Sequence, residues 1–280
     1  ILDQGSSLKD KTQLFVNADD PGLRLITEDS KIQTSYFGID EKLMTKKELS
    51  HDVDFVYCPK CQTKLHFKKI AYSHLGKYEC PKCGLSNPKA DVPKDVTYPL
   101  KGIYNIYNTN AVLLSIEKIF QIPLKELSKQ LTGFKPAFGR QEIIEYKNRD
   151  VMVLLSKNPA GFNRSLDVVN EFNQKEKTIL LVLNDRIPDG RDVSWIWDVD
   201  FEDLKASNII VSGDRTYDMA LRILYTQNEF QISNFKIEED LNKAINTAIS
   251  LTKKQDTLFI LPTYSAMLET RKILSGRKIL

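Results

Sequence analysis

Two pairs of cysteines give the strongest constraint on how this 280-residue chain can fold. Cys58-Pro-Lys-Cys61 and Cys80-Pro-Lys-Cys83 are separated by 18 residues, a spacing typical of a zinc site. Each turn points two thiolates at one ion, and two turns complete a tetrahedral shell of four sulfurs. Because a closed shell has no position for a reactive water, we expect a structural Zn²⁺ here.

The residues between the two pairs predict a zinc ribbon. Lys64–Tyr72 alternates like a strand, Leu75-Gly76 is a turn signal, and Lys77–Glu79 can return antiparallel. We place this insert at residues 52–92. Four thiolates already fill the site, so the three histidines of the chain are expected to be surface or packing residues: His51, His66 and His74.

The positive charge of the chain is concentrated in the same segment. The whole chain has 40 Lys and Arg against 37 Asp and Glu, whereas residues 51–94 have eight Lys against four acids, so the rest sums to −1. Basic residues with aromatic neighbours leave a nucleic-acid-binding ribbon open as an alternative. The excess is modest, and lysines solvate any small ribbon, so we favour a structural insert and expect no nucleic-acid partner.

All four Cys and all three His lie within residues 51–94. The rest of the chain therefore cannot carry Cys-His or Ser-His-Asp catalysis by itself. No run of about 18 apolar residues is present to span a bilayer, and the start at Ile1 has no signal-peptide pattern. We interpret the chain as a fragment of a cytoplasmic protein, where cysteines stay reduced and bind metal.

Two segments flank the ribbon in a predicted α/β arrangement. Gln13–Asn17 predicts a strand that ends in a carboxylate-rich turn at Asp19 and Asp20, and such strand ends bind ligands in α/β sheets. A turn that caps a short helix over Leu23–Thr27 is the plainer interpretation. After the ribbon, Asn105 and Asn108 begin an amphipathic helix, and a carboxamide offers the donor and acceptor that an adenine edge requires.

From about residue 150, apolar strands alternate with helices. Near-continuous apolar strands in β-α units predict a parallel, Rossmann-like sheet covered on both faces. The polar loops after these strands should line one edge of the sheet, where a site is expected. The expected strands cover residues 151–155, 178–183, 208–211 and 257–261.

Both tryptophans of the chain, Trp195 and Trp197, lie in one polar loop, Asp185–Asp198. A long surface loop pinned by two aromatic rings is one interpretation. A partner interface is the other, because aromatic and Arg residues concentrate at interface hot spots. The residue types alone do not decide between them.

Three motifs, in chain order, resemble the later part of the central ATPase domain of the Mur ligase family: Asn17-Ala-Asp-Asp-Pro21, Gly102–Ala111 and Phe138–Glu142. The four-cysteine insert, followed by Asp189–Asp198 and Ser212–Ala220, is similar to one branch of that family, the Mur-ligase-like subunits of lipid II isoglutaminyl synthase. The resemblance covers nearly the whole chain.

The resemblance implies an α/β fold in two domains. Residues 1–148 would form the C-terminal portion of a Mur ligase central domain with the inserted ribbon, and residues 149–280 a Rossmann-like C-terminal domain. The family's phosphate loop, of the form Gly-x-x-Gly-Lys-Thr, does not occur in the 280 residues. We expect it upstream of Ile1, and without it this piece alone should not turn over ATP.

The resemblance also implies a reaction in peptidoglycan synthesis, at the inner face of the membrane. ATP and Mg²⁺ would activate the α-carboxylate of D-glutamate in the lipid II stem peptide as an acyl phosphate. Ammonia from a glutaminase partner, GatD, would then attack it to give D-isoglutamine. Such a reaction needs positioning and charge stabilisation rather than a catalytic Cys or His. This agrees with the absence of Cys and His from the sequence outside residues 51–94.

Site residues follow from the same resemblance. Asp192 would complete the Cys-His pair of the glutaminase across the interface, with Asp198 as the second candidate. Asn108 would contact adenine, with Asn105 beside it. Arg140, near an interdomain hinge, would reach the nucleotide phosphates.

Overall fold

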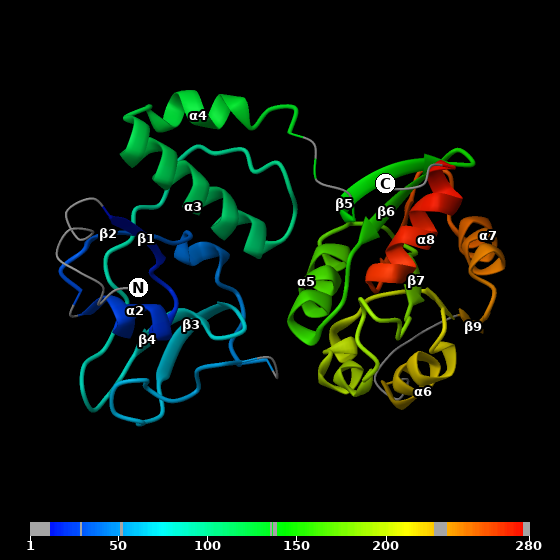
Figure 1. Cartoon of the computed structure of the whole chain (residues 1–280), viewed down its shortest axis with the longest axis horizontal. Coiled ribbons are helices and arrows are strands. Elements are labelled where there is room, and N and C mark those ends of the chain that lie inside the picture. Colours follow the sequence, from blue (N-terminus) through cyan, green and yellow to red (C-terminus); the bar gives the residue numbers. More distant parts are fainter. Residues whose placement is uncertain are drawn as a thin grey trace. The chain divides into compact units, whose positions relative to one another are not determined.

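The computed structural model describes residues 12–28, 30–50, 53–134, 136, 139–226 and 234–276. The chain forms two compact units, Ile1–Phe134 and Lys135–Leu280, each with its own fold (Figure 1). This division lies earlier than the predicted one at residue 148. The difference arises because β5 (Arg140–Tyr146) pairs antiparallel with β6 (Arg149–Leu154) and so joins the sheet of the second unit.

The first unit is built around a small parallel sheet of two strands, β1 (Gln13–Asn17) and β2 (Gln33–Phe37). The connection between them is α2 (Pro21–Glu28). Asp20 Oδ1 accepts hydrogen bonds from the backbone N–H groups of Gly22 and Leu23, at 2.8 and 3.1 Å, which confirms the predicted helix cap. The other helical segments of this unit are η1 (Glu41–Leu43), α3 (Ile103–Phe120) and α4 (Leu124–Gln130).

The ribbon segment forms an antiparallel pair, β3 (His66–Tyr72) and β4 (Leu75–Glu79), as its alternation predicted. Gly76 allows the strands to approach closely, because a Cβ there would lie 2.2 Å from the Lys69 carbonyl oxygen. The inner face of the pair packs in one hydrophobic cluster with α3 and the end of β2, whose buried members are Ile39, Met44, Ala71, Leu75 and Tyr107. The ribbon is therefore built into the core of the first unit.

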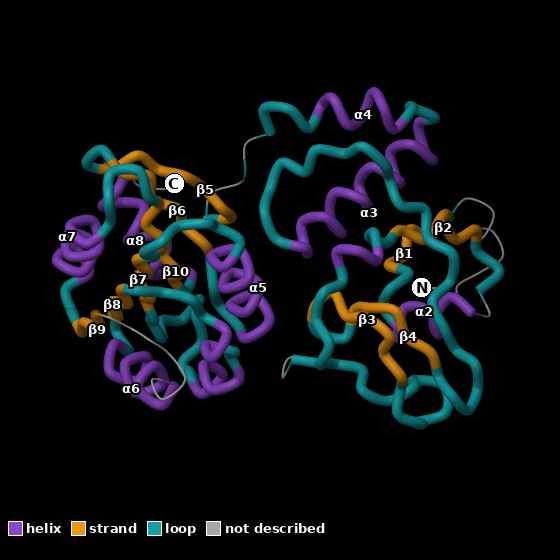
Figure 2. Tube along the Cα trace, turned by 180° about the vertical axis from the view of Figure 1, so that it is seen from behind, coloured by secondary structure: helices purple, strands orange, loops and turns teal. Residues whose placement is uncertain are grey.

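The second unit contains a six-stranded sheet in the order β5-β6-β10-β7-β8-β9, parallel except for the β5–β6 pair (Figure 2). Every residue of β7 (Thr178–Val182) and β8 (Asn208–Ser212) is buried, as expected for strands covered on both faces. The remaining elements are β9 (Asn234–Ile237), β10 (Thr257–Pro262), α5 (Pro159–Asn170), α6 (Thr216–Thr226), α7 (Leu241–Leu251), α8 (Tyr264–Ser275), η2 (Ser194–Asp198) and η3 (Phe201–Asp203).

Helices cover both faces of this sheet. Side chains from α7 and α8, among them Ile245 and Met267, pack in one buried cluster with Val153, Leu180 and Ile260. Phe259, which points the opposite way from its neighbour Ile260, packs against Phe172 just beyond α5. The expected Rossmann-like, parallel-dominated sheet is confirmed, with two edge strands, β5 and β9, that the apolar pattern did not predict.

Candidate functional site

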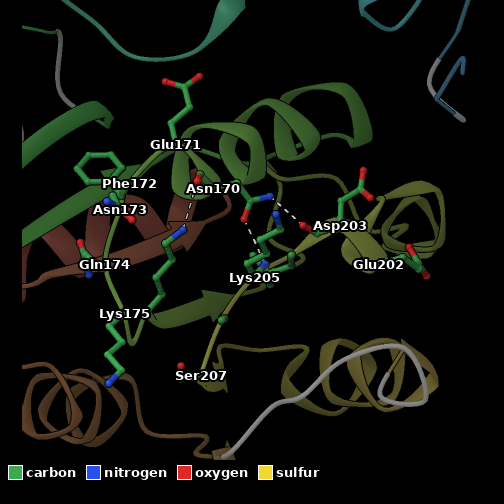
Figure 3. A pocket seen from close by; sticks show the side chains of 13 residues that line it. Asn170, Glu171, Phe172, Asn173, Gln174, Lys175, Glu202, Asp203, Lys205 and Ser207 are labelled. Atoms are coloured by element: carbon green, nitrogen blue, oxygen red, sulfur yellow. Dashed lines mark hydrogen bonds between the residues drawn. The ribbon is translucent and has the colours of Figure 1, made fainter. Parts of the chain in front are cut away.

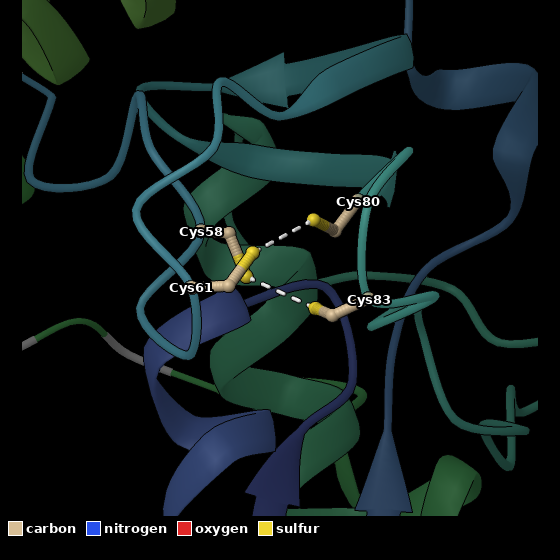
Figure 4. Close-up of side chains that lie close together, drawn as sticks. All are labelled: Cys58, Cys61, Cys80 and Cys83. Carbon is tan, nitrogen blue, oxygen red and sulfur yellow. Dashed lines mark hydrogen bonds between the residues drawn. The ribbon is translucent and has the colours of Figure 1, made fainter.

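The four cysteines of the ribbon lie together. Their sulfur atoms are all within 4.8 Å of one another, and none forms a disulfide (Figure 4). Cys58 Sγ lies 3.6 Å from Cys83 Sγ, and Cys61 Sγ lies 3.4 Å from Cys80 Sγ, so each short contact joins the two turns. A tetrahedral zinc shell with bonds of about 2.3 Å places its sulfurs about 3.8 Å apart, close to these separations. The donor set therefore fits Zn²⁺.

Both cysteine turns have the same backbone geometry. The N–H of Cys58 donates to the Thr63 carbonyl and the N–H of Cys80 to the Leu85 carbonyl, at 2.7 and 2.8 Å. The residue after each second cysteine is left-handed, with φ of 59° at Gln62 and 73° at Gly84. This repeated turn is what aims two thiols from each pair at one point.

The electrostatics of the cluster also favour a cation. The hydroxyl and backbone of Thr63 stabilise the thiolate of Cys61 and lower its pKa to about 6. The Leu85 backbone favours the Cys83 thiolate, but burial and the three neighbouring thiols raise its pKa to about 12. Four thiols this close cannot all ionise unless a positive ion compensates them.

Many lysines of the ribbon segment are neutralised by carboxylates. Ion pairs join Lys60 to Glu28, Lys68 to Glu79, Lys69 to Glu41 and Lys77 to Asp19, at 2.7 to 3.1 Å. Half of the eight lysines counted between residues 51 and 94 are therefore paired, which weakens the nucleic-acid interpretation. His74 is buried beside Asp20, at 3.7 Å, and packs edge-on against Phe55, so it is a packing residue.

The two predicted adenine-binding residues lie in the first turns of α3. Asn105 is buried and donates to the Lys101 carbonyl at 2.6 Å, so its side chain holds the turn that precedes the helix. Asn108 is exposed. Tyr107, between them, donates its hydroxyl to buried Asp19 at 2.9 Å. Sequence reasoning missed Tyr107, because its partner is 88 positions away.

Arg140, the predicted phosphate-binding residue, is exposed at the start of β5 in the second unit. The residues around it are held by α8. Glu142 accepts two hydrogen bonds from the Arg271 guanidinium, at 2.6 and 2.7 Å. Gly139 has φ of 72°, and a Cβ there would lie 2.0 Å from Met267 Sδ. Arg140 is thus presented to solvent from a rigid base, in a different unit from Asn105 and Asn108.

Asp192 lies at the surface in the loop after β7. Its Oδ1 accepts a hydrogen bond from the Ser194 backbone N–H at 2.8 Å, and this contact holds the pKa of the carboxyl below its usual range. Asp192 is therefore an ionised, accessible carboxylate at neutral pH. Asp198, the second candidate, is exposed at the end of η2.

The loop that carries Asp192 is fixed from beneath. Trp195 is half-buried and packs against Phe162 of α5, with ring centroids 6.2 Å apart. Arg222 of α6 is buried and donates to the carbonyls of Ile196 and Val199, at 3.2 and 2.6 Å. Trp197, by contrast, is 46% exposed. Trp195 thus behaves as expected for a surface loop pinned by an aromatic ring. Trp197 faces solvent, as expected for a partner interface.

An open pocket of about 870 Å³ lies between residues 170–177 and 202–207 (Figure 3). Its buried lysine, Lys177, donates to the Asn170 carbonyl at 3.3 Å and so caps the C-terminal end of α5. Burial, with Lys205 nearby, lowers the pKa of Lys177. This pocket borders the amino ends of β7 and β8, whereas the carboxyl ends were expected to hold the site, and Lys177 already has a structural role there.

The chain is similar in sequence to known proteins. Residues 155–267 match the MurT ligase C-terminal family. Over 95% of its length, the chain is 28% identical to the lipid II isoglutaminyl synthase (glutamine-hydrolyzing) subunit MurT of Streptococcus pneumoniae. Over 91%, it is 31% identical to the same subunit of Staphylococcus aureus. The chain spans only 62% and 60% of these two relatives.

Two solved structures share the fold. A pseudomurein peptide ligase type C from Methanothermus fervidus has a TM-score of 0.64 and 21% identity, over 94% of this chain and 56% of that one. MurF from Acinetobacter baumannii has a TM-score of 0.53 and 16% identity, over 94% and 51%. The described residues include no helix long and apolar enough to cross a membrane. The chain therefore has a Mur-ligase-like fold, and over more than nine-tenths of its length it is similar in sequence to the MurT subunits of lipid II isoglutaminyl synthase.

Proposed function

We propose that this chain is part of the ligase subunit of a lipid II isoglutaminyl synthase. It would amidate the D-glutamate α-carboxylate of the lipid II stem peptide to D-isoglutamine, at the inner face of the membrane. The observation that carries this proposal is the Asp192 loop, which lies within the segment matched by the MurT ligase C-terminal family and presents an ionised carboxylate at the surface. The glutaminase subunit, GatD, would supply the ammonia.

The distribution of reactive side chains supports two subunits. Glutamine hydrolysis by a glutaminase needs a nucleophile and a base, and all Cys and His of this chain lie in or beside the ribbon. In the proposed complex, Asp192 accepts a hydrogen bond from the partner's catalytic histidine and fixes its tautomer. The low pKa of Asp192 keeps it ionised for this task. Asp198 remains the second candidate.

A hydrophobic surface beside this loop supports docking of the partner. It consists of Trp197 and the outward face of α6, whose apolar residues are 45 to 70% exposed: Tyr217, Leu221, Leu224 and Tyr225. We call these five residues the α6 surface. Exposed aromatic and aliphatic side chains in one continuous stripe are typical of protein interfaces.

The ligase chemistry would use ATP and Mg²⁺ bound with the central domain. Mg²⁺ would neutralise phosphate charge while the carboxylate is activated as an acyl phosphate. From this chain, Asn108 would contact adenine with Asn105 beside it, and Arg140 would reach the phosphates. Cys58, Cys61, Cys80 and Cys83 would hold a Zn²⁺ with a structural role, because four sulfurs leave no open position.

Replacing Asp192 by Asn in the full-length protein tests the proposal. With the glutaminase subunit present, we expect glutamine hydrolysis to fall by about a hundredfold or more, because an amide cannot stabilise the imidazolium. Complex formation, measured by gel filtration, should persist, and added ammonium should restore amidation. Asp198→Asn is the matched control and should retain hydrolysis. Unchanged hydrolysis in Asp192→Asn would mean that this carboxylate has no part in the glutaminase site.

A further inference from the structure

Asp19 lies at the carboxyl end of β1, and its side chain is completely buried. We propose that Asp19 is a positioning residue that couples the ribbon, and the metal it would hold, to the nucleotide-binding end of α3. The part of this inference that concerns nucleotide rests on the proposed function. The coupling itself rests on contacts among residues of the first unit.

One oxygen of Asp19 faces the ribbon. Oδ1 accepts from Lys77 Nζ of β4 at 2.7 Å and from Asn87 Nδ2 at 3.0 Å. Asn87 lies just after the second cysteine turn, and its carboxamide also receives the Tyr78 N–H at 2.8 Å and donates to the Gly76 carbonyl at 2.9 Å. The position of this oxygen therefore depends on β4 and on the chain that leaves the metal cluster.

The other oxygen faces α3. Oδ2 accepts from the Tyr107 hydroxyl at 2.9 Å. Burial raises the pKa of Tyr107, and the Asp19 carboxylate adds to the shift, so the hydroxyl keeps its proton and remains the donor. Because Tyr107 directly precedes Asn108 in the helix, a movement of Tyr107 carries Asn108 with it.

The backbone around Asp19 reinforces both connections. The Gly76 N–H of the ribbon donates to the Asp19 carbonyl at 3.0 Å. On the helix side, Asn110 donates to the Gly38 carbonyl at 2.8 Å, and Tyr72 of β3 packs edge-on against Tyr107, with centroids 5.9 Å apart. Ribbon, strand ends and helix thus form one buried polar network with an apolar flank, which favours concerted movement over independent movement.

The same contacts exclude a simpler role for Asp19 as an available ligand or base. Two donors contact Oδ1 and one contacts Oδ2, and the Asp19 side chain has no exposed area. Gly38 leaves no spare room, since a Cβ there would lie 3.2 Å from Asp19 Oδ2 and 3.0 Å from Ala90 Cβ. Asp19 therefore acts through what it holds.

Two hydroxyl deletions test the coupling in the full-length protein. Tyr107→Phe removes only the donor to Asp19. Tyr98→Phe is the matched control, because its hydroxyl also bonds to α3, at Asn110 Oδ1 across 3.0 Å, without touching Asp19. Each protein is compared with and without a zinc chelator, by hydrogen exchange of the α3 amides and by the dissociation constant of a non-hydrolysable ATP analogue.

We expect chelation to lower α3 protection and to weaken nucleotide binding by about tenfold in the wild type and in Tyr98→Phe. In Tyr107→Phe, binding should already be weak with zinc present, and chelation should add little. A merely structural role for Tyr107 would lower stability but leave the response to chelation intact. If Tyr107→Phe does not fold, Asp19→Asn replaces it, since the amide keeps the shape but loses the ionic contact with Lys77, and the same loss of response is expected.

Different outcomes separate the two proposals. An equal response to chelation in wild type and Tyr107→Phe overturns the coupling, as does unchanged α3 protection while β3 and β4 lose theirs. Purified protein without zinc overturns the metal's part in it. If neither the wild type nor any variant binds the nucleotide analogue, the proposed function is contradicted instead. Hydrogen exchange of the α3 amides then still shows whether Asp19 transmits the effect of zinc removal to α3.

Discussion

Trp197 lies edge-on against Tyr225, with ring centroids 5.4 Å apart and an interplanar angle of 73°. The contact joins η2, at the end of the Asp192 loop, to the last turn of α6. Both rings remain accessible, Trp197 to 46% and Tyr225 to 70%. Two large aromatic rings that pack on each other and still face solvent are a strong candidate for the centre of an interface.

Truncating the α6 surface should weaken the complex with the proposed glutaminase partner. We expect Tyr225→Ala to raise the dissociation constant about thirtyfold, equivalent to about 2 kcal/mol for a central aromatic residue. Titration calorimetry with the separate subunits measures the change. Ile143→Ala is the control, because Ile143 is 57% exposed on β5 and outside the α6 surface. Equal affinities for the two variants would place the interface elsewhere.

Replacing Arg222, the buried arginine of α6, should destabilise the loop that carries Asp192. Its guanidinium donates to two loop carbonyls and to Glu202, and lies 5.5 Å from the Trp197 ring centroid. Arg222→Met removes one charged donor from each carbonyl, which keeps only its backbone N–H partner, and leaves Glu202 without its arginine, so we expect the free energy of unfolding to fall by about 2 kcal/mol. Arg215→Met, which breaks the ion pairs of a more exposed arginine, should cost less than about 1 kcal/mol. Urea denaturation distinguishes the two, and a similar loss for both would show that the buried hydrogen bonds of Arg222 stabilise the loop no more than an exposed ion pair does.

Removing Lys77 should cost far more than removing a surface lysine of the same ribbon. Lys77→Met leaves the carboxylate of Asp19, which has no exposed area, without its counter-ion, and we expect a loss of about 3 kcal/mol in the free energy of unfolding. Lys68→Met breaks the solvent-exposed pair with Glu79 and should cost less than about 1 kcal/mol. Comparable denaturation midpoints for the two variants would contradict the buried network around Asp19.

Removing one cysteine of the four-sulfur cluster should abolish the zinc binding that we propose. Metal analysis of the wild type should give about one zinc per chain, and Cys83→Ser should lose it and unfold at a lower temperature. Lys82→Ser, at the exposed neighbouring position of the same turn, should keep the metal and its melting temperature. A Cys83→Ser protein with a full complement of zinc would exclude the four-sulfur shell.

Local sequence patterns predicted the buried strands and the cysteine cluster, because each of these has a signature within a short stretch of sequence. The apolar runs of β7, β8 and β10 predicted strands buried on both faces, and the spacing of Cys58, Cys61, Cys80 and Cys83 predicted a cluster that the structure brings together. The edge strands β5 and β9 escaped prediction because edge positions are partly exposed and carry mixed polar residues, so no apolar run marks them.

The sequence by itself determined the fold class, the cysteine cluster and, through its motifs, the family resemblance. Only the tertiary structure decided that Asp19 is buried rather than open to a ligand, and that Trp195 is anchored while Trp197 faces solvent. The reason is physical: the fate of a side chain depends on its contacts, and those of Asp19 come from residues 58, 68 and 88 positions away. The pattern of residues next to Asp19 in the sequence does not reveal which distant residues will contact it in the folded protein.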